Sequence, residues 1–287
     1  MLAALLVCVL ASAWMLDKSF LSPGAQTELL SHAVELGILA VPMTLARVLH
    51  ERPLPPSLAL IVVGLALVLL PTLLIAVQPD LGTAVLIVLT GATAIFLAGL
   101  GWRYILGAGA LALASLPALW YVMHDYQRKR ILTLLDPDSD PLGAGYHIIQ
   151  SKIAIGSGGF FGKGWLNGSQ GQLEFLPERS TDFIFAVIGE ELGFVGCVIL
   201  LLLYLLVVSR AIYLATQTQD TFARLLSGSL ALIFFVYVFI NAGMVSGILP
   251  VVGVPLPLIS YGGTSMVTLL AGFGILMSLY SHRKFAA

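Results

Sequence analysis

The chain has 287 residues, of which 59% are hydrophobic and 10% are charged, against roughly 25% charged residues in an ordinary soluble domain. Its formal net charge is −1, from 14 Lys and Arg against 15 Asp and Glu, so it lacks the basic field that collects nucleic acid. Composition therefore excludes a soluble globular enzyme and a nucleic-acid-binding protein. It predicts an all-α, polytopic transmembrane helix bundle.

Apolar blocks of roughly the twenty residues that cross a bilayer as a helix recur along the chain. They predict eight spans, of which the second is the least hydrophobic: residues 2–16, 29–48, 57–77, 81–100, 104–123, 184–209, 224–247 and 260–281. No positive residue precedes the first block, so we expect a retained span there rather than a cleaved signal peptide. We take residues 1–287 as one transmembrane domain.

Basic residues gather at one set of the short connections between these blocks. They are Arg47, Arg52, Arg103, Arg210, Arg224, Arg283 and Lys284. The opposite short connections carry only Lys18. The positive-inside rule then predicts that both termini are cytoplasmic.

One connection is much longer than the others. Residues 124–183 form a loop of about sixty residues facing the outside, where most helix connections have only a few. Long loops escape the charge rule, and an ordered loop on a closely connected bundle usually carries function. The loop is therefore where we expect the active site.

The middle of this loop offers a helix and a glycine-rich segment. Residues 146–155 mix apolar and polar positions, which fits either a short interfacial helix or an ordinary packed helix. Residues 156–165, GSGGFFGKGW, resemble a nucleotide-phosphate loop, but Ser157 and Gly164 depart from that motif. Two alternatives remain: a structural glycine loop, or one whose backbone N–H groups, with Lys152 or Lys163, approach a lipid pyrophosphate.

The end of the loop runs directly into the next apolar block. Ser180 or Thr181 is predicted to cap that helix, with Asp182 in or beside its first turn. The helix macrodipole there favours an ionised carboxylate that can accept a proton. Capping alone is the structural alternative for Asp182.

Three further acids fall inside apolar blocks, where an exposed charge costs several kcal/mol. Helical rotation of 100° per residue puts Asp182 and Glu190 about 80° apart, with Glu191 nearly opposite Asp182. Glu190 is therefore the better candidate to line a cavity shared with Asp182, although a structural role is open for both glutamates. Glu35, in the second block, belongs to the same class.

Three long strings resemble the SEDS (shape, elongation, division and sporulation) family: residues 125–165, 172–193 and 244–263. The match runs from about Pro42 to Lys284. The Asp-Tyr-Gln-Arg opening of the first string and its Tyr-His-Ile-Ile-Gln-Ser-Lys segment favour the elongation branch, RodA, over the division branch, FtsW.

The resemblance implies a bundle of ten transmembrane helices in the bacterial inner membrane that polymerises lipid II outside that membrane. It also implies a class B penicillin-binding protein and other elongation-complex membrane proteins as partners, and an essential Asp in the Thr-Asp-Phe motif, here Asp182. The accompanying candidates for substrate binding are Lys152, Lys163, Arg179, Glu190, Glu191 and Glu35. No cofactor is evident, and a divalent cation could share the binding of pyrophosphate.

The sequence departs from the family pattern at three places. The resemblance starts at what would be the third family helix, and Ser180 replaces the usual His before Thr-Asp-Phe. Residues 27–38 form a shorter segment than in the family and lack its Arg-Trp, its Pro-Ser-Glu and the Lys that follows. Two other functions therefore stay open. One is a lipid II flippase whose cavity contains Glu35, Glu190 and Glu191, and the other is a non-catalytic scaffold.

Overall fold

The computed structural model describes residues 23–76, 80–123, 125–140, 143–173, 175–176 and 178–281. The predicted first span and Lys18, Arg283 and Lys284 lie outside these residues. Throughout the described ranges the regular structure is helical, which confirms the predicted fold class.

Seven long helices correspond to the other predicted spans. They are α2 (Pro23–His50), α3 (Leu58–Ala76), α4 (Leu81–Leu97), α5 (Trp102–Val122), α9 (Ile184–Thr216), α10 (Thr221–Val245) and α11 (Gly263–Ser281). By length and composition, α3, α9, α10 and α11 are sufficient to cross a bilayer, and α4 is a shorter apolar helix.

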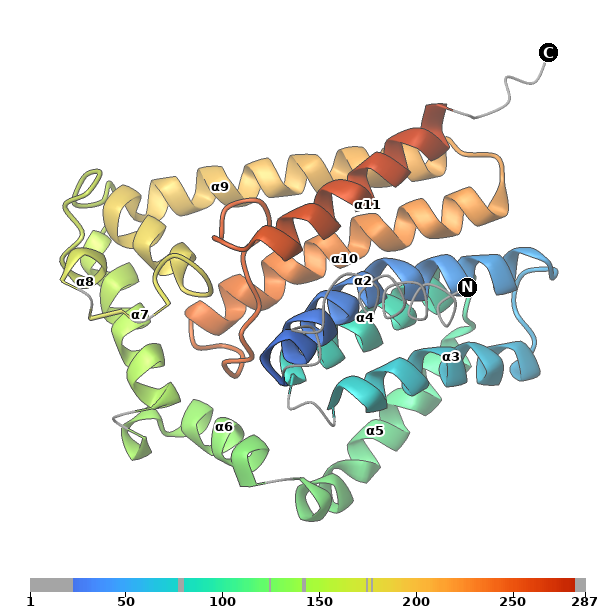
Figure 1. Cartoon of the computed structure of the whole chain (residues 1–287), viewed down its shortest axis with the longest axis horizontal. Helices are drawn as coiled ribbons and strands as arrows, with labels where there is room; N and C mark the ends of the chain where they lie inside the picture. Colours follow the sequence, from blue (N-terminus) through green and yellow to red (C-terminus); the bar gives the residue numbers. More distant parts are fainter. Residues whose placement is uncertain are drawn as a thin grey trace.

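Helix α10 is the centre of the bundle (Figure 1). On one side it packs against α2 and α4, with Leu226 and Tyr237 in the shared core. On another side it packs against α9, where Phe234 and Val238 are buried. A helix that is apolar all round lies either in a protein core or in a bilayer, and α10 is covered mainly by its protein neighbours.

The long loop forms a helical layer at one end of the bundle (Figure 1). It contains α6 (Asp125–Leu135), the short 3₁₀ helix η2 (Pro137–Ser139), α7 (Ala144–Gly158) and α8 (Ser169–Gln172). The α2–α3 and α9–α10 turns lie at the opposite end. The bundle thus has a basic end and a loop end, as the charge pattern predicted.

Helix α7 confirms the predicted loop helix and decides between its two alternatives. Ile148, Ser151 and Ala154 are at most 1% exposed, because α7 packs against α9. The Ser151 hydroxyl donates to the carbonyl of Val245, at the end of α10, over 2.8 Å. Helix α7 is therefore a packed helix rather than one lying free at an interface.

Helix α9 is broken near its loop end, a feature that its continuous apolar sequence did not predict. Gly193 has φ 68° and ψ −167°, and this conformation removes the usual bonds from the amides of residues 194 and 195 to the carbonyls of 190 and 191. The glycine-rich loop replaces both pairs. Its bonds are Lys163 N to Glu190 O at 3.0 Å, Gly164 N to Glu191 O at 2.9 Å, Phe194 N to Gly159 O at 2.9 Å and Val195 N to Phe160 O at 3.1 Å.

The glycine-rich loop is therefore structural. A Cβ at Gly162 would collide with the Glu191 carbonyl, and one at Gly193 would collide with the amide nitrogen of Gly162. The amides of Gly162, Lys163 and Gly164 all donate within the protein. These three amides are therefore not available to a lipid pyrophosphate, which favours the structural alternative for the loop. The loop instead satisfies backbone groups that a break at membrane depth would leave unpaired.

Candidate functional site

Asp182 lies in a turn and not in a helix. Helix α9 begins at Ile184, and its N-cap, Phe183, makes no side-chain cap. The amides of Thr181 and Phe183 both donate to the carbonyl of Glu178, and the Thr181 hydroxyl bonds the Glu178 carboxylate at 2.7 Å. The prediction that Ser180 or Thr181 caps α9 is wrong, because both residues lie in this turn and the turn ends before the helix begins.

The turn is held by three hydrogen bonds to three consecutive carbonyls. The Tyr261 amide donates to Ser180 O at 2.8 Å, and the Ser260 hydroxyl donates to Thr181 O at 2.5 Å. The Asn241 side-chain amide donates to Asp182 O at 2.8 Å. We call Asn241, Ser260 and Tyr261 the carbonyl clamp. It fixes the backbone on which the Asp182 carboxylate stands.

Asn241 is the most deeply placed part of this clamp. Its side chain is 0% exposed near the loop end of α10, and its second N–H bonds the carbonyl of Val254 at 2.7 Å. One amide thus ties α10 to both the Asp182 turn and the 250–254 segment. Our sequence reasoning missed Asn241, although an amide within an apolar helix is itself a signal of function.

The Asp182 carboxylate is partly buried against the 250–254 segment, where a Cβ on Gly253 would lie 3.3 Å from its Oδ2. No hydrogen bond or ion pair to this carboxylate is found within the described part of the chain. Burial raises the pKa of Asp182, and the nearby Glu178 carboxylate raises it further. The macrodipole argument predicted the opposite preference. A raised pKa suits a general base that must work near neutral pH.

His147 is a neighbour of this turn that the sequence did not single out. Its ring stacks on Phe183, with centroids 5.5 Å apart and planes 16° from parallel. Burial lowers the pKa of His147, against the opposing effect of Glu178 and Asp140. A neutral imidazole would leave the charges of Glu178 and Asp182 uncompensated, which is consistent with the raised pKa of Asp182.

The raised pKa of Asp182 leads to a prediction about pH. If Asp182 is the base, turnover falls as pH drops through its pKa. Glu178→Gln removes the charge that raises this pKa, so we expect the acid limb of the pH–rate profile to move to lower pH. The check is the pH–rate profile of both proteins. An acid limb that stays in place, or moves to higher pH, would contradict the assignment.

The structure separates the two glutamates of α9 and reverses their predicted roles. Glu190 is 0% exposed and is bonded to the loop, whereas Glu191 lines a cavity beside α9. The rotation argument failed because Asp182 precedes the helix, so no helical angle connects it to either glutamate. Glu35 lies elsewhere, where it accepts a hydrogen bond from Thr264 of α11 at 2.9 Å.

The cavity beside α9 has a volume of about 810 Å³. Its long wall is apolar and extends along α9 from Ile184 to Leu203. Polar side chains lie at its loop end, among them Arg179, Ser180 and Glu191. This arrangement of an apolar wall with a polar end fits a lipid that carries a charged head group.

The remaining predicted cations are placed differently from one another. Lys163 Nζ lies 2.6 Å from Glu190 Oε1, so its charge is already paired. Lys152 is exposed, and its side chain lies over Gly247. Arg179 donates to the carbonyl of Gly171 at the cavity. Among the residues that the structure describes, no three His, Cys, Asp or Glu side chains gather as metal ligands would.

Comparison with known proteins identifies the family. Residues 33–285 match the FtsW/RodA/SpoVE family of cell cycle proteins. The chain is 61% identical over 251 residues to the peptidoglycan glycosyltransferase MrdB of Escherichia coli K12, covering 87% of this chain and 68% of that protein. It is 41% identical over 210 residues to a probable peptidoglycan glycosyltransferase FtsW of Trichlorobacter lovleyi, covering 73% of this chain and 54% of the relative.

The fold agrees with this match. A chain from a structure on the coordination of polymerization and crosslinking by a peptidoglycan synthase complex superposes with a TM-score of 0.74 at 36% identity, covering 88% of this chain and 71% of that one. The protein belongs to the FtsW/RodA/SpoVE family, and the predicted SEDS resemblance is confirmed. The greater identity to MrdB than to FtsW supports the elongation branch.

Proposed function

We propose that this protein is a peptidoglycan glycosyltransferase that polymerises lipid II into glycan strands during cell elongation. Membership in the family and 61% identity to a peptidoglycan glycosyltransferase support the activity. The observation that carries the mechanism is the Asp182 carboxylate, which has no partner within the described residues and stands on a clamped backbone at the loop end of the bundle.

In this reaction a sugar hydroxyl of one lipid-linked precursor attacks the anomeric carbon of another with inversion. The new glycosidic bond forms as the bond to undecaprenyl pyrophosphate breaks, and Asp182 takes the hydroxyl proton. A pyrophosphate leaves more readily than the alcohol that a glycosidase must protonate. One carboxylate therefore suffices where glycosidases use two.

The charge that develops on the pyrophosphate needs a cation, and Arg179 is the best placed. Its guanidinium lies at the polar end of the cavity, three residues before Asp182. Lys152 is a second, exposed candidate. The apolar wall along α9 would hold part of a polyprenyl chain, and Glu191 would contact the polar head. We do not place Lys163 or Glu190 on the substrate, because their charges are paired with each other. We do not place Glu35 there either, because it lies elsewhere, bonded to Thr264 of α11.

The chemistry requires the loop end to face outward, with both termini in the cytoplasm. Ser139 is exposed in η2 of that layer, while Cys197 is buried. With Cys8 replaced by Ser, we expect Ser139→Cys to react with a membrane-impermeant thiol reagent added to intact spheroplasts. Reaction only after the cytoplasmic side is opened would refute this orientation.

The partner we propose is a class B penicillin-binding protein, which would cross-link the glycan product. The structural relative above comes from a complex that combines polymerization and crosslinking. Purified chain, the cognate partner and labelled lipid II distinguish this function from its alternatives. Glycan ladders support a polymerase, translocation without ladders a flippase, and neither product a scaffold. The flippase is less well supported, because only Glu191 of its three acids lines the described cavity.

A further inference from the structure

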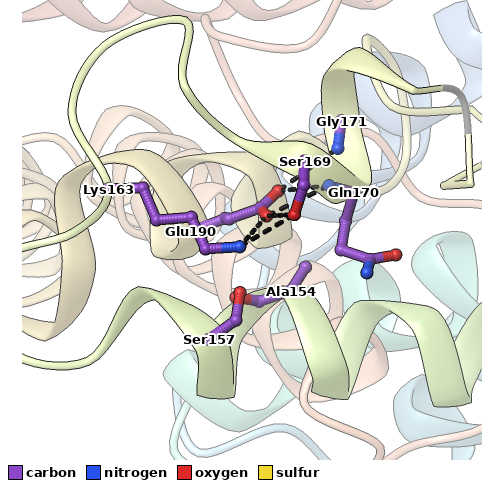
Figure 2. Close-up of polar contacts among 7 residues, drawn as sticks. All are labelled: Ala154, Ser157, Lys163, Ser169, Gln170, Gly171 and Glu190. Atoms are coloured by element: carbon purple, nitrogen blue, oxygen red, sulfur yellow. Dashed lines mark hydrogen bonds and ion pairs between the residues drawn. The ribbon is translucent and has the colours of Figure 1, made fainter.

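Glu190 receives an unusual number of donors for a carboxylate inside an apolar helix (Figure 2). Lys163 Nζ lies 2.6 Å away, and the Ser169 hydroxyl lies 3.1 Å away. The amides of Gln170 and Gly171 donate at 3.0 and 3.2 Å. All four donors come from residues 163–171, so one side chain of α9 holds this section of the loop by hydrogen bonds.

These four donors require an ionised carboxylate at Glu190, and its ion pair with Lys163 satisfies only one of them. Two of the donors are backbone N–H groups of the first turn of α8, and such groups need an acceptor. Lys163 then neutralises the buried charge, which would otherwise cost several kcal/mol. Glu190 therefore both caps α8 and pairs with Lys163.

Gly171 links the Glu190 carboxylate to the cavity. Its N–H donates to Glu190 Oε2, while its carbonyl accepts from Arg179 Nη1. Arg179 is the cation at the polar end of the cavity. A single residue, Gly171, thus connects the buried carboxylate to the guanidinium that lines the cavity.

We propose that Lys163 and Glu190 form a positioning latch that holds α8 and, through Gly171, sets the Arg179 guanidinium for the head group of the lipid-linked substrate. The assignment of Arg179 rests on the proposed function. Neither latch residue touches the reacting atoms. Their loss should therefore weaken substrate binding more than turnover.

The first test is kinetic. We expect Glu190→Gln and Arg179→Ala each to raise KM for lipid II by roughly tenfold, with kcat changed by about twofold or less, and the double variant to be little worse than either. Multiplying effects would show that the latch does not act through Arg179 and would overturn the proposal. The matched control is Glu51→Gln, which breaks the exposed Arg47–Glu51 pair and should leave KM unchanged.

A charge swap separates a simple ion pair from a latch that also caps α8. In the K163E/E190K protein the opposite charges remain, but a lysine faces the two amide donors. We expect no rescue of KM. Recovery to the wild-type KM would overturn the capping part of the proposal. If Glu190→Gln does not fold, Ser169→Ala removes one donor alone and should raise KM by roughly twofold to threefold, and no rise would contradict the latch.

A second readout does not depend on activity. Gln172, at the end of α8, is exposed and lines the cavity. We expect thiol labelling of Gln172→Cys to accelerate several-fold when Glu190→Gln is added, and not when Glu51→Gln is added. An unchanged rate would refute the latch. Unchanged KM for Arg179→Ala together with accelerated labelling would instead refute the substrate role of Arg179 and leave the latch standing.

Discussion

Asp182→Asn should reduce lipid II polymerisation by roughly 10²–10⁴-fold, the range lost with a general base, while the protein stays folded. The amide keeps the shape of the side chain but cannot take up the proton of the attacking hydroxyl. Because no hydrogen bond to this carboxylate is found among the described residues, its removal should cost little stability. Glycan synthesis by purified proteins at matched concentration measures the first effect, and thermal unfolding in detergent the second.

The sign of the stability change is a separate check. The folded-state pKa of Asp182 is raised. The carboxylate therefore lowers the stability of the folded state once pH rises above the ordinary pKa of Asp, and this loss is complete above the raised pKa. Asp182→Asn should then be no less stable than wild type at neutral pH, and any gain should disappear as pH falls below the ordinary Asp range. A helix cap would instead lose about 1 kcal/mol. Asp138→Asn, on an exposed carboxylate of the same loop, is the control and should keep full activity.

Asn241→Ala should have the second largest effect. The substitution leaves the carbonyls of Asp182 and Val254 without their shared donor, and a buried group that loses its partner costs about 1–3 kcal/mol. Releasing the Asp182 backbone should also lower kcat by roughly tenfold to a hundredfold, because small displacements of a catalytic group are expensive. Thermal unfolding and kcat for lipid II measure the two losses.

Ser229→Ala is the matched control for the clamp. Ser229 is also 0% exposed in α10, but its hydroxyl bonds only within the helix, to Leu225 O at 2.7 Å. We expect little change in kcat for this variant. If Asn241→Ala lost stability to the expected extent yet kept the wild-type kcat, the clamp would hold the fold without positioning Asp182.

The spans could be predicted because crossing a bilayer imposes a length on each apolar block. The break at Gly193 could not, since one glycine in an apolar run resembles an ordinary helix residue and the break depends on bonds from residues 159–164. The turn before α9 is why the rotation argument misassigned Glu190 and Glu191, because Asp182 does not lie on the helix.

The candidate base could be predicted, but its surroundings could not. Asp182 was identified from an acid beside a membrane helix and from the Thr-Asp-Phe motif. Its contact with Asn241 spans 59 residues of sequence, and the pairing of Lys163 with Glu190 spans 27. Contacts at such separations follow from the packed fold. Local pattern shows that Asn241 or Lys163 is unusual without showing what it binds.

The most direct measurement is the joint yield of glycan and free undecaprenyl pyrophosphate from labelled lipid II, for wild type and Asp182→Asn with the cognate penicillin-binding protein. The proposed reaction releases one lipid pyrophosphate for each glycosidic bond. We therefore expect equal yields of bonds and released lipid from wild type, and background yields of both from Asp182→Asn. Glycan made by Asp182→Asn at near the wild-type rate, with equal protein and partner binding, would contradict the account.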